Sequence, residues 1–434
     1  MKLRDFLEID FSLFFAAIIL TFFGILFIYS SGITSTGVLV SNEYVRQIVW
    51  AISGIMAALF LAMINYRRLY DLSFYFYLGT LILLVYTCLF GRLVNGARAW
   101  IGIGSFGIQP SEFAKITTIL FLARYLESSR RNKNHLIRFA FSCIIVFIPM
   151  VIILLQPDFG TSLVFIPILL GMTFIAGISF RYIIFLSAGI IFTGIFMVLP
   201  HWHILWGTMP FFSILTNVRF VAVCAAALFL VMVIAFIGFR LYKKRYFFWI
   251  IYGSAIVVFS LGVSFVTHRV LKDYQIMRLI VFLDPNVDPR GAGWNIIQSI
   301  TAIGSGGLWG KGYLQGTQSH YRFLPQQSTD FIFSIFTEEW GLLGGILVFA
   351  LFLLICLRFI KIMKTTSDVF GSFIVAGLSA MYIFHFLINV GMTMGIMPIT
   401  GIPLLFMSYG GSALISAMIG IGLALSIYIR RYQH

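Results

Sequence analysis

The sequence predicts an all-α polytopic membrane protein, and three observations support this: the composition, the length of the apolar runs and the placement of the charges. Of the 434 residues, 60% are hydrophobic and 10% are charged, whereas a soluble domain carries about 25% charged residues. A chain this apolar needs lipid as its solvent. We therefore expect a single integral membrane domain over residues 1–434 rather than several soluble domains.

The apolar runs are long enough for helices to cross a bilayer, since a span needs about 20 residues. Membrane strands are only about ten residues long and alternate in polarity, which these runs do not. About twelve spans are expected, and 112–127 is the weakest because Glu112 and Lys115 lie in its first turn. The expected spans are 11–31, 46–66, 73–90, 112–127, 138–155, 160–178, 181–199, 218–239, 246–267, 331–357, 370–392 and 402–429.

Basic residues indicate how the spans are oriented, because lysine and arginine gather in cytoplasmic loops. With the N-terminus inside, 19 of the 30 basic residues lie in cytoplasmic segments and 11 outside. The even number of spans then returns Arg430 and Arg431 to the cytoplasm. A net charge of +15 would otherwise favour nucleic-acid binding, but these charges sit in short loops. We expect both termini in the cytoplasm and no nucleic-acid partner.

One outer segment, 268–330, departs from this charge pattern. It contains six of the 11 outside basic residues, whereas outer loops are usually poor in lysine and arginine. Its charged residues are Arg269, Lys272, Asp273, Arg278, Asp284, Asp288, Arg290, Lys311, Arg322 and Asp330. A long outer loop of mixed charge favours an anionic ligand that is handled at the outer surface.

The sequence DPNVDPRGAGWNIIQS, residues 284–299, contains two Asp-Pro pairs four residues apart and predicts turns. Aspartate before proline commonly caps a turn, which is one interpretation of Asp284 and Asp288. The other interpretation is chemical. A carboxylate beside Arg278 and Arg290 at the membrane surface would serve as a general base toward a hydroxyl.

The sequence GSGGLWGKGYLQGTQS, residues 304–319, exposes backbone amides to close approach, and Lys311 adds a cation. It predicts either a cradle for a diphosphate or a re-entrant hairpin without a ligand, and its spacing is not that of a Walker loop. Asp330 follows at the start of a span, where a carboxylate favours a helix N-terminus. Glu338 and Glu339 lie further along, and carboxylates within lipid are usually functional or paired.

A second outer loop, 91–111, leads into a span whose first turn contains Glu112 and Lys115. Because these residues are three apart, they lie on one helix face and are able to pair. The alternatives are a closed ion pair, or a Lys115 side chain that points into a cavity and binds an anion. At another outer junction, Asp158 is expected to cap a helix.

Polar residues in the last spans predict contacts between helices. His385 and Asn389 lie four apart and are expected to form interhelical hydrogen bonds. Residues 395–413 carry two prolines and several glycines, and such irregular backbone must be buried in protein or line a cavity. The four cysteines lie within apolar runs, which predicts packing roles and neither a disulfide nor a metal site.

Five motifs occur together and in order: NGARAW with QPSEFAK, QPDFGTSL, DPNVDPRGAGW with IGSGGLWGKG, LPQQSTDFIF with EEWG, and PITGIPLLFMSYGGS. They resemble the SEDS (shape, elongation, division, sporulation) family of peptidoglycan glycosyltransferases over nearly the whole chain. The GTQS after the glycines is more similar to the elongation branch, RodA, than to the division branch, FtsW.

The resemblance implies an enzyme of the bacterial inner membrane that serves cell elongation and shape. Such an enzyme polymerises lipid II into β-1,4-linked glycan strands at the outer face and releases undecaprenyl diphosphate. The family's essential aspartate corresponds to Asp288, and two further important positions correspond to Lys115 and Trp100. The partner that the resemblance implies is a class B penicillin-binding protein, which is a transpeptidase.

Asp288 is therefore the candidate catalytic base, and it would act in a single displacement that inverts the donor sugar. Cations near the leaving diphosphate would stabilise its developing charge. The candidate substrate-binding residues are Lys115, Trp100, Arg98, Glu112, Arg278, Arg290, Lys311 and Asp330. No metal ligands and no cofactor are evident, although a divalent cation, Mg or Mn, would suit the same electrostatic task.

The chain departs from the family pattern at three places. Gln326 and Ser328 replace an acidic residue and a histidine, and Trp294 stands where tyrosine is usual. Residues 200–267 add an apparent helix pair to the ten-span core that the resemblance implies. Because a pair of spans preserves orientation, Asp288 stays on the outer side.

The main alternative function is a flippase or transporter for the lipid-linked precursor, because many spans with broken helices suit such a protein. The charged cluster gathers on one face rather than near the midplane, which argues against it. A scaffold that only recruits cell-wall enzymes is a third class, and it predicts that Asp288 is replaceable without loss of function.

Overall fold

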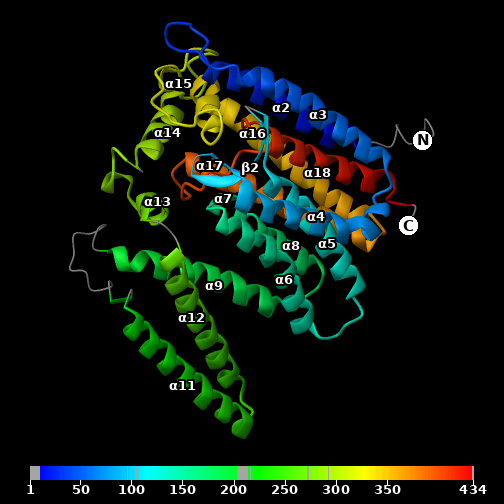
Figure 1. The fold of residues 1–434 in the computed structure, drawn as a ribbon, viewed down its shortest axis with the longest axis vertical. Helices are drawn as coiled ribbons and strands as arrows, with labels where there is room; N and C mark the ends of the chain where they lie inside the picture. The colour runs from blue at the N-terminus through cyan, green and yellow to red at the C-terminus, as the bar shows by residue number, and fades with distance from the viewer. Residues whose placement is uncertain are drawn as a thin grey trace. The chain divides into compact units, whose positions relative to one another are not determined.

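The computed structural model describes residues 10–94, 96–103, 106–202, 214–215, 217–270, 273–291 and 293–432. The chain divides into two compact units (Figure 1). Unit 1 comprises Met1–Ile178 and Gln298–His434, and unit 2 comprises Ser179–Ile297.

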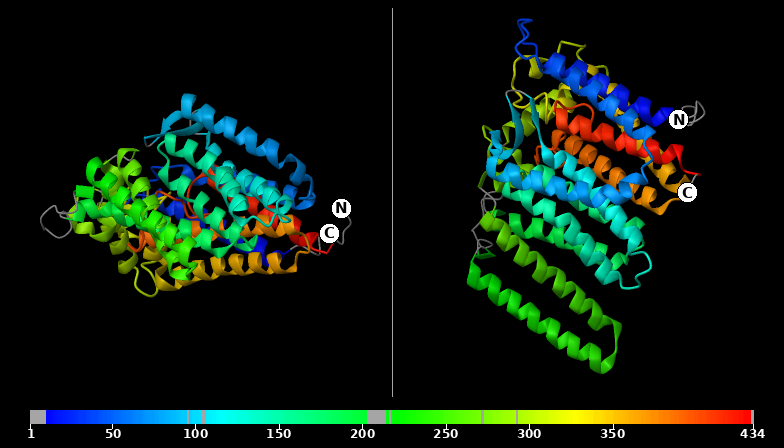
Figure 2. Two further views of the ribbon diagram at one scale, coloured as in Figure 1. Left: turned by 90° about the horizontal axis from the view of Figure 1, so that it is seen from below. Right: turned by 45° about the vertical axis from the view of Figure 1, so that its right-hand side comes forward.

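Unit 1 is a bundle of long apolar helices. Its helices are α2 (Phe11–Ser31), α3 (Glu43–Met63), α4 (Arg68–Phe90), α5 (Pro110–Ser128), α6 (His135–Leu155), α7 (Phe159–Leu163), α8 (Phe165–Ile175), α15 (Thr317–His320), α16 (Ile332–Thr365), α17 (Val369–Thr393) and α18 (Gly411–Ile429). Helices α3 and α18 lie side by side (Figure 2), and a Cβ at Gly422 would come within 2.6 Å of the Ala58 carbonyl oxygen. Small residues at such contacts let helices in lipid approach closely.

One end of the bundle is recognisable from ion pairs and hydrogen bonds. Arg358 at the far end of α16 contacts the Asp10 carboxylate just before α2, and its guanidinium lies 6.0 Å from the Tyr428 ring centroid near the end of α18. The Ser367 amide donates to the Arg431 carbonyl at 3.2 Å. The start of α2, the turn between α16 and α17 and the end of α18 therefore share one end of the bundle.

Unit 2 contains α9 (Phe180–Val198), the 3-10 turn η1 (Leu199–His201), α11 (Val218–Tyr242), α12 (Arg245–Val270), α13 (Asp273–Leu283) and the 3-10 turn η3 (Pro285–Val287). Helix α14 (Trp294–Ser305) runs across the boundary between the units. The expected helix pair within 200–267 corresponds to α11 and α12, which run side by side (Figure 1). Lys243, with a left-handed φ of 51°, makes the turn between them.

Among the described residues, ten helices are long and apolar enough to cross a membrane, and they match ten of the twelve expected spans. The other two differ for separate reasons. Helix α5 carries Glu112, Lys115, Arg124 and Glu127 within 19 residues. The run 160–178 forms two shorter helices, α7 and α8, which meet at Val164 and together cover only Phe159–Ile175. The expected count of twelve is therefore not confirmed.

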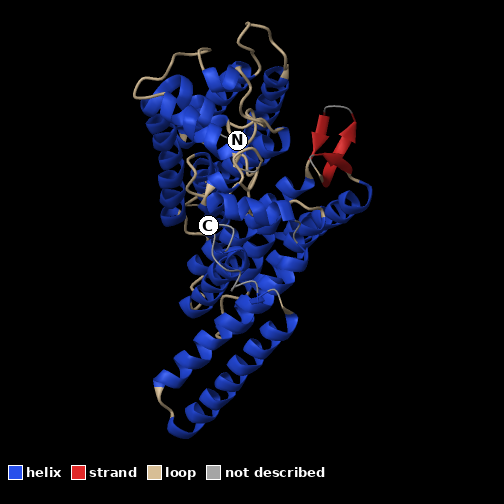
Figure 3. Cartoon of the chain, turned by 90° about the vertical axis from the view of Figure 1, so that its left-hand side faces the viewer, coloured by secondary structure: helices blue, strands red, loops and turns tan. Residues whose placement is uncertain are grey.

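A small antiparallel sheet interrupts the helical fold where a plain outer loop was expected (Figure 3). Its strands are β1 (Arg92–Val94), β2 (Ala97–Ile103) and β3 (Phe106–Ile108), in the order β1-β2-β3. Gly96, at φ 85°, lies between β1 and β2, and the sequence Asn-Gly is a strong hairpin signal. That local signal predicts the hairpin, whereas the length of the apolar runs does not.

Candidate active site

Asp288 lies in a compact turn between α13 and α14. Its Oδ1 accepts a hydrogen bond from the Gly291 amide at 3.0 Å, and its carbonyl accepts one from the Gly293 amide at 2.9 Å. The side chain is half-buried. A backbone amide therefore fixes the orientation of the carboxylate.

Asp284, the other aspartate of the segment, has a capping role. It is the N-cap of η3, and its Oδ1 accepts a hydrogen bond from the Asn286 amide at 2.9 Å. The capping interpretation is thus confirmed for Asp284. Asp288 also accepts a hydrogen bond within a turn, so the two carboxylates differ by position more than by local hydrogen bonding.

Two glycines permit close contacts in this turn: Gly291 leaves the space that the Asp288 side chain occupies, and Gly293 lies against backbone. A Cβ at Gly291 would come 2.2 Å from Oδ2 of Asp288, and a Cβ at Gly293 would come 2.2 Å from the Pro285 carbonyl oxygen. Real Cβ atoms do not approach other atoms so closely, so neither position tolerates a larger residue without movement. The Arg-Gly-Ala-Gly sequence therefore shapes the turn around the carboxylate.

The turn is anchored to a long helix of unit 2 by apolar packing. Ile276 and Ile280 of α13 form a buried cluster with Met197 of α9, and Val287 packs against it. Burying such side chains stabilises each by about 1.5–3 kcal/mol relative to exposure. Of the candidate cations in this unit, Arg278 on α13 is half-buried and Arg290 in the turn is exposed.

Lys115 and Glu112 form a buried ion pair on α5. The Lys115 Nζ lies 2.9 Å from the Glu112 carboxylate and 3.2 Å from Nε2 of His385 on α17. Ser416 of α18 donates to Oε2 of Glu112 at 3.3 Å. Both charged side chains are about as buried as the core, with exposed fractions of 1% and 2%. The ion-pair alternative is the one the structure shows.

His385 is held as a neutral acceptor by its two neighbours. Its Nδ1 lies 3.1 Å from the Pro403 carbonyl oxygen, which only accepts, so Nδ1 carries the hydrogen. Nε2 then accepts from the Lys115 ammonium. The sequence predicted an interhelical contact for His385, and this is confirmed, but no local signal identified Lys115 as its partner.

Trp100 and Arg98 lie on β2 of the small sheet. Trp100 pairs with Arg92 and Arg98 pairs with Leu93 across the β1–β2 hairpin. The Trp100 ring lies over Gly107 of β3, where a Cβ would come 2.9 Å from the ring. Trp100 is half-buried and Arg98 is exposed, so the sheet presents an indole and a guanidinium close together on one strand.

The glycine segment after α14 docks against a break in α16. Gly341, at φ 65° and ψ −163°, interrupts the helix. The amides of Lys311 and Gly312 donate to the Glu338 and Glu339 carbonyls at 3.0 Å, and the Leu342 amide donates to Gly307 at 2.9 Å. These bonds satisfy groups that a broken helix would otherwise leave unpaired in lipid.

This docking bears on the two interpretations of the glycine segment, a diphosphate cradle and a hairpin without a ligand. The Gly310 amide donates to the Gly306 carbonyl at 2.8 Å, so the amides of residues 310–312 all have backbone partners. A Cβ at Gly310 would come 2.0 Å from the Glu339 carbonyl oxygen. The glycines permit backbone to approach backbone here, and the alternative of a hairpin without a ligand fits the contacts better.

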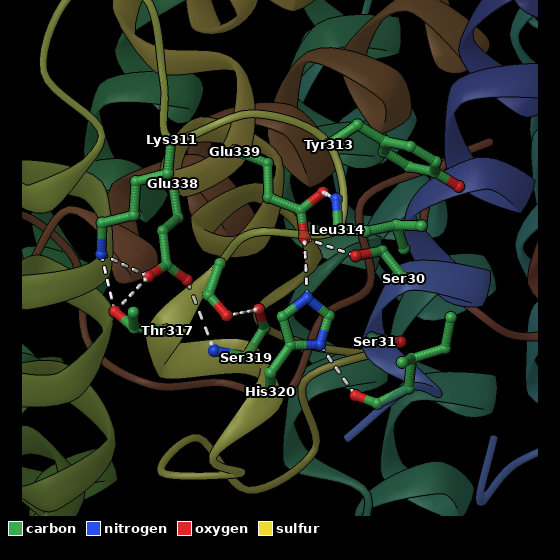
Figure 4. Close-up of polar contacts among 12 residues, drawn as sticks. Ser30, Ser31, Lys311, Tyr313, Leu314, Thr317, Ser319, His320, Glu338 and Glu339 are labelled. Atoms are coloured by element: carbon green, nitrogen blue, oxygen red, sulfur yellow. Dashed lines mark hydrogen bonds and ion pairs between the residues drawn. The ribbon is translucent and has the colours of Figure 1, made fainter. Parts of the chain in front are cut away.

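Lys311 also has a carboxylate partner. Its Nζ lies 2.9 Å from Oε1 of Glu338 and donates to the Thr317 hydroxyl at 2.7 Å (Figure 4). The same Glu338 oxygen accepts from the Gln318 amide at 2.9 Å. Glu338 is fully buried, so this carboxylate gathers the lysine and the start of α15 onto α16.

Glu339, the next carboxylate, holds the same loop to α2. It accepts hydrogen bonds from the Ser30 hydroxyl and from the Leu314 amide, the latter at 3.0 Å, and His320 Nε2 lies 3.8 Å away (Figure 4). Burial first, and the Glu339 charge second, raise the pKa of Tyr313 to about 12. Glu338 and Glu339 were expected to be either functional or paired, and Glu338 is paired with Lys311.

Asp330 lies two residues before α16 and is half-buried. The helix N-cap is Phe331 and not Asp330, so the expected placement of the carboxylate is one residue off. The Asp330 carbonyl accepts from the Asn389 amide group at 3.0 Å, and Asn389 also donates to Ile402 at 2.8 Å. Asn389 thus ties α17 to the irregular segment, as expected of an interhelical contact.

The irregular backbone before α18 is packed among helices. A Cβ at Gly160 would come 2.3 Å from the Thr400 carbonyl oxygen, and Gln47 donates to the Ser408 carbonyl at 3.1 Å. Nearby, Asp158 caps α7 through the Thr161 amide at 3.1 Å, as expected. Burial raises the pKa of the Asp158 carboxyl, which also accepts from Gln109 at 2.8 Å.

The candidate residues belong to both units. Asp288, Arg278 and Arg290 belong to unit 2. The unit 1 residues lie in the α5 ion pair, the small sheet, the Lys311–Glu338 contact and the start of α16. Within the described residues, no group of three or more His, Cys, Asp or Glu side chains could hold a metal ion.

Comparison with known proteins places this fold among cell-wall proteins. The model of the FtsW, RodA and SpoVE family, described as "Cell cycle protein", matches residues 11–206 and 206–433. The peptidoglycan glycosyltransferase RodA of Treponema pallidum is 49% identical over 435 residues, covering 99% of this chain and 100% of the relative. The peptidoglycan glycosyltransferase MrdB of Escherichia coli K12 is 32% identical over 391 residues, covering 89% and 85%.

Solved structures show the same fold. A chain from a structure described as "Structural coordination of polymerization and crosslinking by a peptidoglycan synthase complex" has a TM-score of 0.67 at 26% identity, with 98% of this chain and 99% of that chain covered. The rod shape determining protein RodA of Thermus thermophilus has a TM-score of 0.61 at 23% identity, with 98% of each chain covered. At that identity the second likeness is one of fold alone.

Proposed function

This chain belongs to the SEDS family of FtsW, RodA and SpoVE proteins, and from that premise we propose that it polymerises lipid II with the Asp288 carboxylate as general base. It is a peptidoglycan glycosyltransferase of the RodA type. The observation that carries the assignment of the base is the Asp288 turn, where Gly291 donates its amide to the carboxylate and leaves the space for its Oδ2.

The proposed step is a single displacement with balanced bonds. Asp288 removes the proton from the acceptor sugar hydroxyl as that oxygen attacks the anomeric carbon of the donor. The bond from this carbon to the diphosphate oxygen breaks, and undecaprenyl diphosphate leaves with the electron pair. Attack opposite the leaving group inverts the anomeric centre. A positioned general base contributes about 10²–10⁴-fold to such a step.

The leaving diphosphate needs positive charge, and the candidate cations differ in how ready they are to supply it. Arg290 is exposed in the Asp288 turn and is therefore accessible to a ligand. Lys115 and Lys311 each face a carboxylate, so binding an anion there would require exchange of an existing partner. We assign the first electrostatic role to Arg290 and a second one to Arg278 on α13.

The proposed setting is the outer face of the cytoplasmic membrane, with both chain termini in the cytoplasm. The distribution of 19 basic residues in the expected cytoplasmic segments supports this orientation. The similarity to a chain of a peptidoglycan synthase complex supports a class B penicillin-binding protein as partner. A divalent ion is a further proposal, tested by adding Mg²⁺ or Mn²⁺ to chelator-treated enzyme.

The deciding experiment measures glycan polymerisation from purified lipid II by the detergent-solubilised chain together with a class B penicillin-binding protein. Asp288→Asn keeps an oxygen acceptor for the Gly291 amide but removes the base. Asp284→Asn is the matched control, because asparagine also caps η3. We expect Asp288→Asn to lose at least about 10²-fold in rate and Asp284→Asn to retain activity.

Equal rates for both variants and wild type would remove Asp288 as the base. Loss of activity in both would assign a structural role to the turn. Absence of product from the wild type, with partner and divalent ions present, would favour the flippase alternative. That alternative would then be tested by translocation of labelled lipid II in vesicles.

A further inference from the structure

We propose that a groove between the start of α4 and the end of α5 binds the headgroup of a phospholipid that carries both a phosphate and a primary ammonium, namely phosphatidylethanolamine. The groove has a volume of about 460 Å³. Its polar lining comes from Asp71, Arg124 and Ser128, and its other lining residues are aromatic. None of these residues takes part in the proposed sugar transfer.

Opposite charges line the groove without neutralising each other. The Arg124 guanidinium donates to the Asp71 carbonyl at 3.2 Å and lies 5.2 Å from the Tyr70 ring centroid. In the part of the chain that the structure describes, neither the Arg124 guanidinium nor the Asp71 carboxylate forms an ion pair. A zwitterionic headgroup supplies the missing partner of each, with its phosphate on Arg124 and its ammonium on Asp71.

The aromatic lining suits the glycerol and upper chain of a lipid. Tyr75 and Phe74 have exposed fractions of 68% and 43%. The ring centroids of Phe74 and Phe121 lie 5.6 Å apart. The half-buried Tyr125 completes this surface. Rings of this kind gather where hydrocarbon meets headgroups, and an ammonium over an aromatic face gains a further attraction.

The groove lies at the end of unit 1 where charged side chains concentrate. Arg67, just before α4, pairs with Asp368 at the start of α17 and lies 3.6 Å from Glu127 near the end of α5. Exposed Arg130 and Arg131 follow α5 directly. This is the same end at which α18 finishes, so the groove opens where the helices leave the apolar layer.

Charge complementarity selects one class of phospholipid over its relatives. A phosphatidylglycerol headgroup has the phosphate but no ammonium, so it brings a net negative charge near the Asp71 carboxylate without a cation to pair with it. A choline headgroup has an ammonium without N–H donors and cannot hydrogen-bond to Asp71. An ethanolamine headgroup has a phosphate, which accepts from the Arg124 guanidinium. It also has an ammonium with three N–H donors, which donates to the Asp71 carboxylate.

The test measures binding of phosphatidylethanolamine, phosphatidylcholine and phosphatidylglycerol to the full chain in detergent by native mass spectrometry. The variants are Asp71→Asn and Arg124→Gln, with Arg131→Gln as a matched control on an exposed arginine of the same end. Thermal unfolding of each variant verifies that the fold is kept. Wild type and Arg131→Gln are expected to prefer phosphatidylethanolamine about three- to fivefold, the range of a single exposed ion pair.

The variants separate the two charges of the headgroup. Asp71→Asn is expected to lose the preference for ethanolamine and to bind phosphatidylglycerol more tightly than wild type does. Arg124→Gln is expected to weaken binding of all three lipids. Equal binding of the three lipids by wild type, or an unchanged preference in folded Asp71→Asn, would overturn the proposal. Loss of the preference in Arg131→Gln as well would place the lipid outside the groove.

Discussion

A carboxylate that accepts a proton must be held in one orientation, and at Asp288 the glycine three residues later contributes to this because it has no side chain. Gly291 donates its amide to the carboxylate, and its missing Cβ leaves the space that Oδ2 fills. Gly293 allows its backbone to lie close to the Pro285 carbonyl oxygen. At the scale of single residues, the position of the base therefore depends on its neighbours as much as on the aspartate.

Gly291→Ala is expected to reduce lipid II polymerisation by about 10²-fold, because a displacement of about 1 Å at a reacting group has that effect. The Cβ would lie 2.2 Å from Oδ2 and push the carboxylate aside. Gly304→Ala is the control, since a Cβ there meets nothing within 4 Å. Equal activity of the two folded variants would show that the carboxylate does not need this orientation.

The buried pair of Lys115 and Glu112 predicts strong thermodynamic coupling. Removing one partner leaves a charge buried without compensation, which destabilises a protein by about 3–5 kcal/mol. Lys115→Met and Glu112→Gln are each expected to lower the unfolding temperature in detergent. The double variant is expected to be less destabilised than the sum of the two. Additive changes in the unfolding temperature would mean that the Lys115–Glu112 interaction does not stabilise the fold.

At the scale of elements, α16 is completed by a segment from outside the helix. Residues 307–312 donate to and accept from the backbone on both sides of Gly341, while Glu338 and Glu339 hold the following loop. The broken helix and the glycine segment are thus one structural unit. The N-terminal part of α16 obtains from this segment the hydrogen bonds that its own interrupted turn does not form.

Gly310→Ala is expected to destabilise this unit severely, because a Cβ would come 2.0 Å from the Glu339 carbonyl oxygen. Gly307→Ala is the matched variant, since Gly307 also has a positive φ but its Cβ would meet nothing within 4 Å. A left-handed alanine alone costs about 1–2 kcal/mol. Thermal unfolding in detergent should therefore rank Gly310→Ala well below Gly307→Ala, and equal values would exclude the backbone contact as the cause.

At the scale of the whole molecule, the positions of the charges predict the orientation. Lys244 lies at the exposed turn between α11 and α12, and Arg322 is exposed in the loop before α16. In a background without Cys88, Cys143, Cys224 and Cys356, cysteine at Lys244 is expected to react only from the cytoplasmic side. Cysteine at Arg322 is expected to react only from the outer side with an impermeant reagent on intact spheroplasts. Labelling of both from one side would refute the proposed topology.

Much of the fold follows from the sequence because apolar length is a strong local signal. Ten spans, including the α11–α12 pair, were predictable from apolar length. The capping roles of Asp284 and Asp158 were predictable from the residue type and its position. Helix α5 and the α7–α8 break deviate because charge and tertiary contacts override apolarity there.

Contacts between distant segments were not predictable from local patterns. His385 lies 270 residues from its partner Lys115, and Ser30 lies 309 residues from Glu339. The glycine segment showed that close approach would occur, but its composition does not distinguish a ligand from another stretch of backbone. The partner of the glycine segment is the stretch of α16 around the break at Gly341, and this break is visible only in the folded structure.

The docking of the glycine segment on α16 also bears on how the chain enters the membrane. The donors at 310–312 precede their acceptors, Glu338 and Glu339, so they emerge from the ribosome first. The hydrogen-bonding partners of helix α16 are therefore already synthesised when that helix is inserted, and they belong to the same chain. The order of the two segments along the chain makes the earlier one an intramolecular template for the integration of the later one.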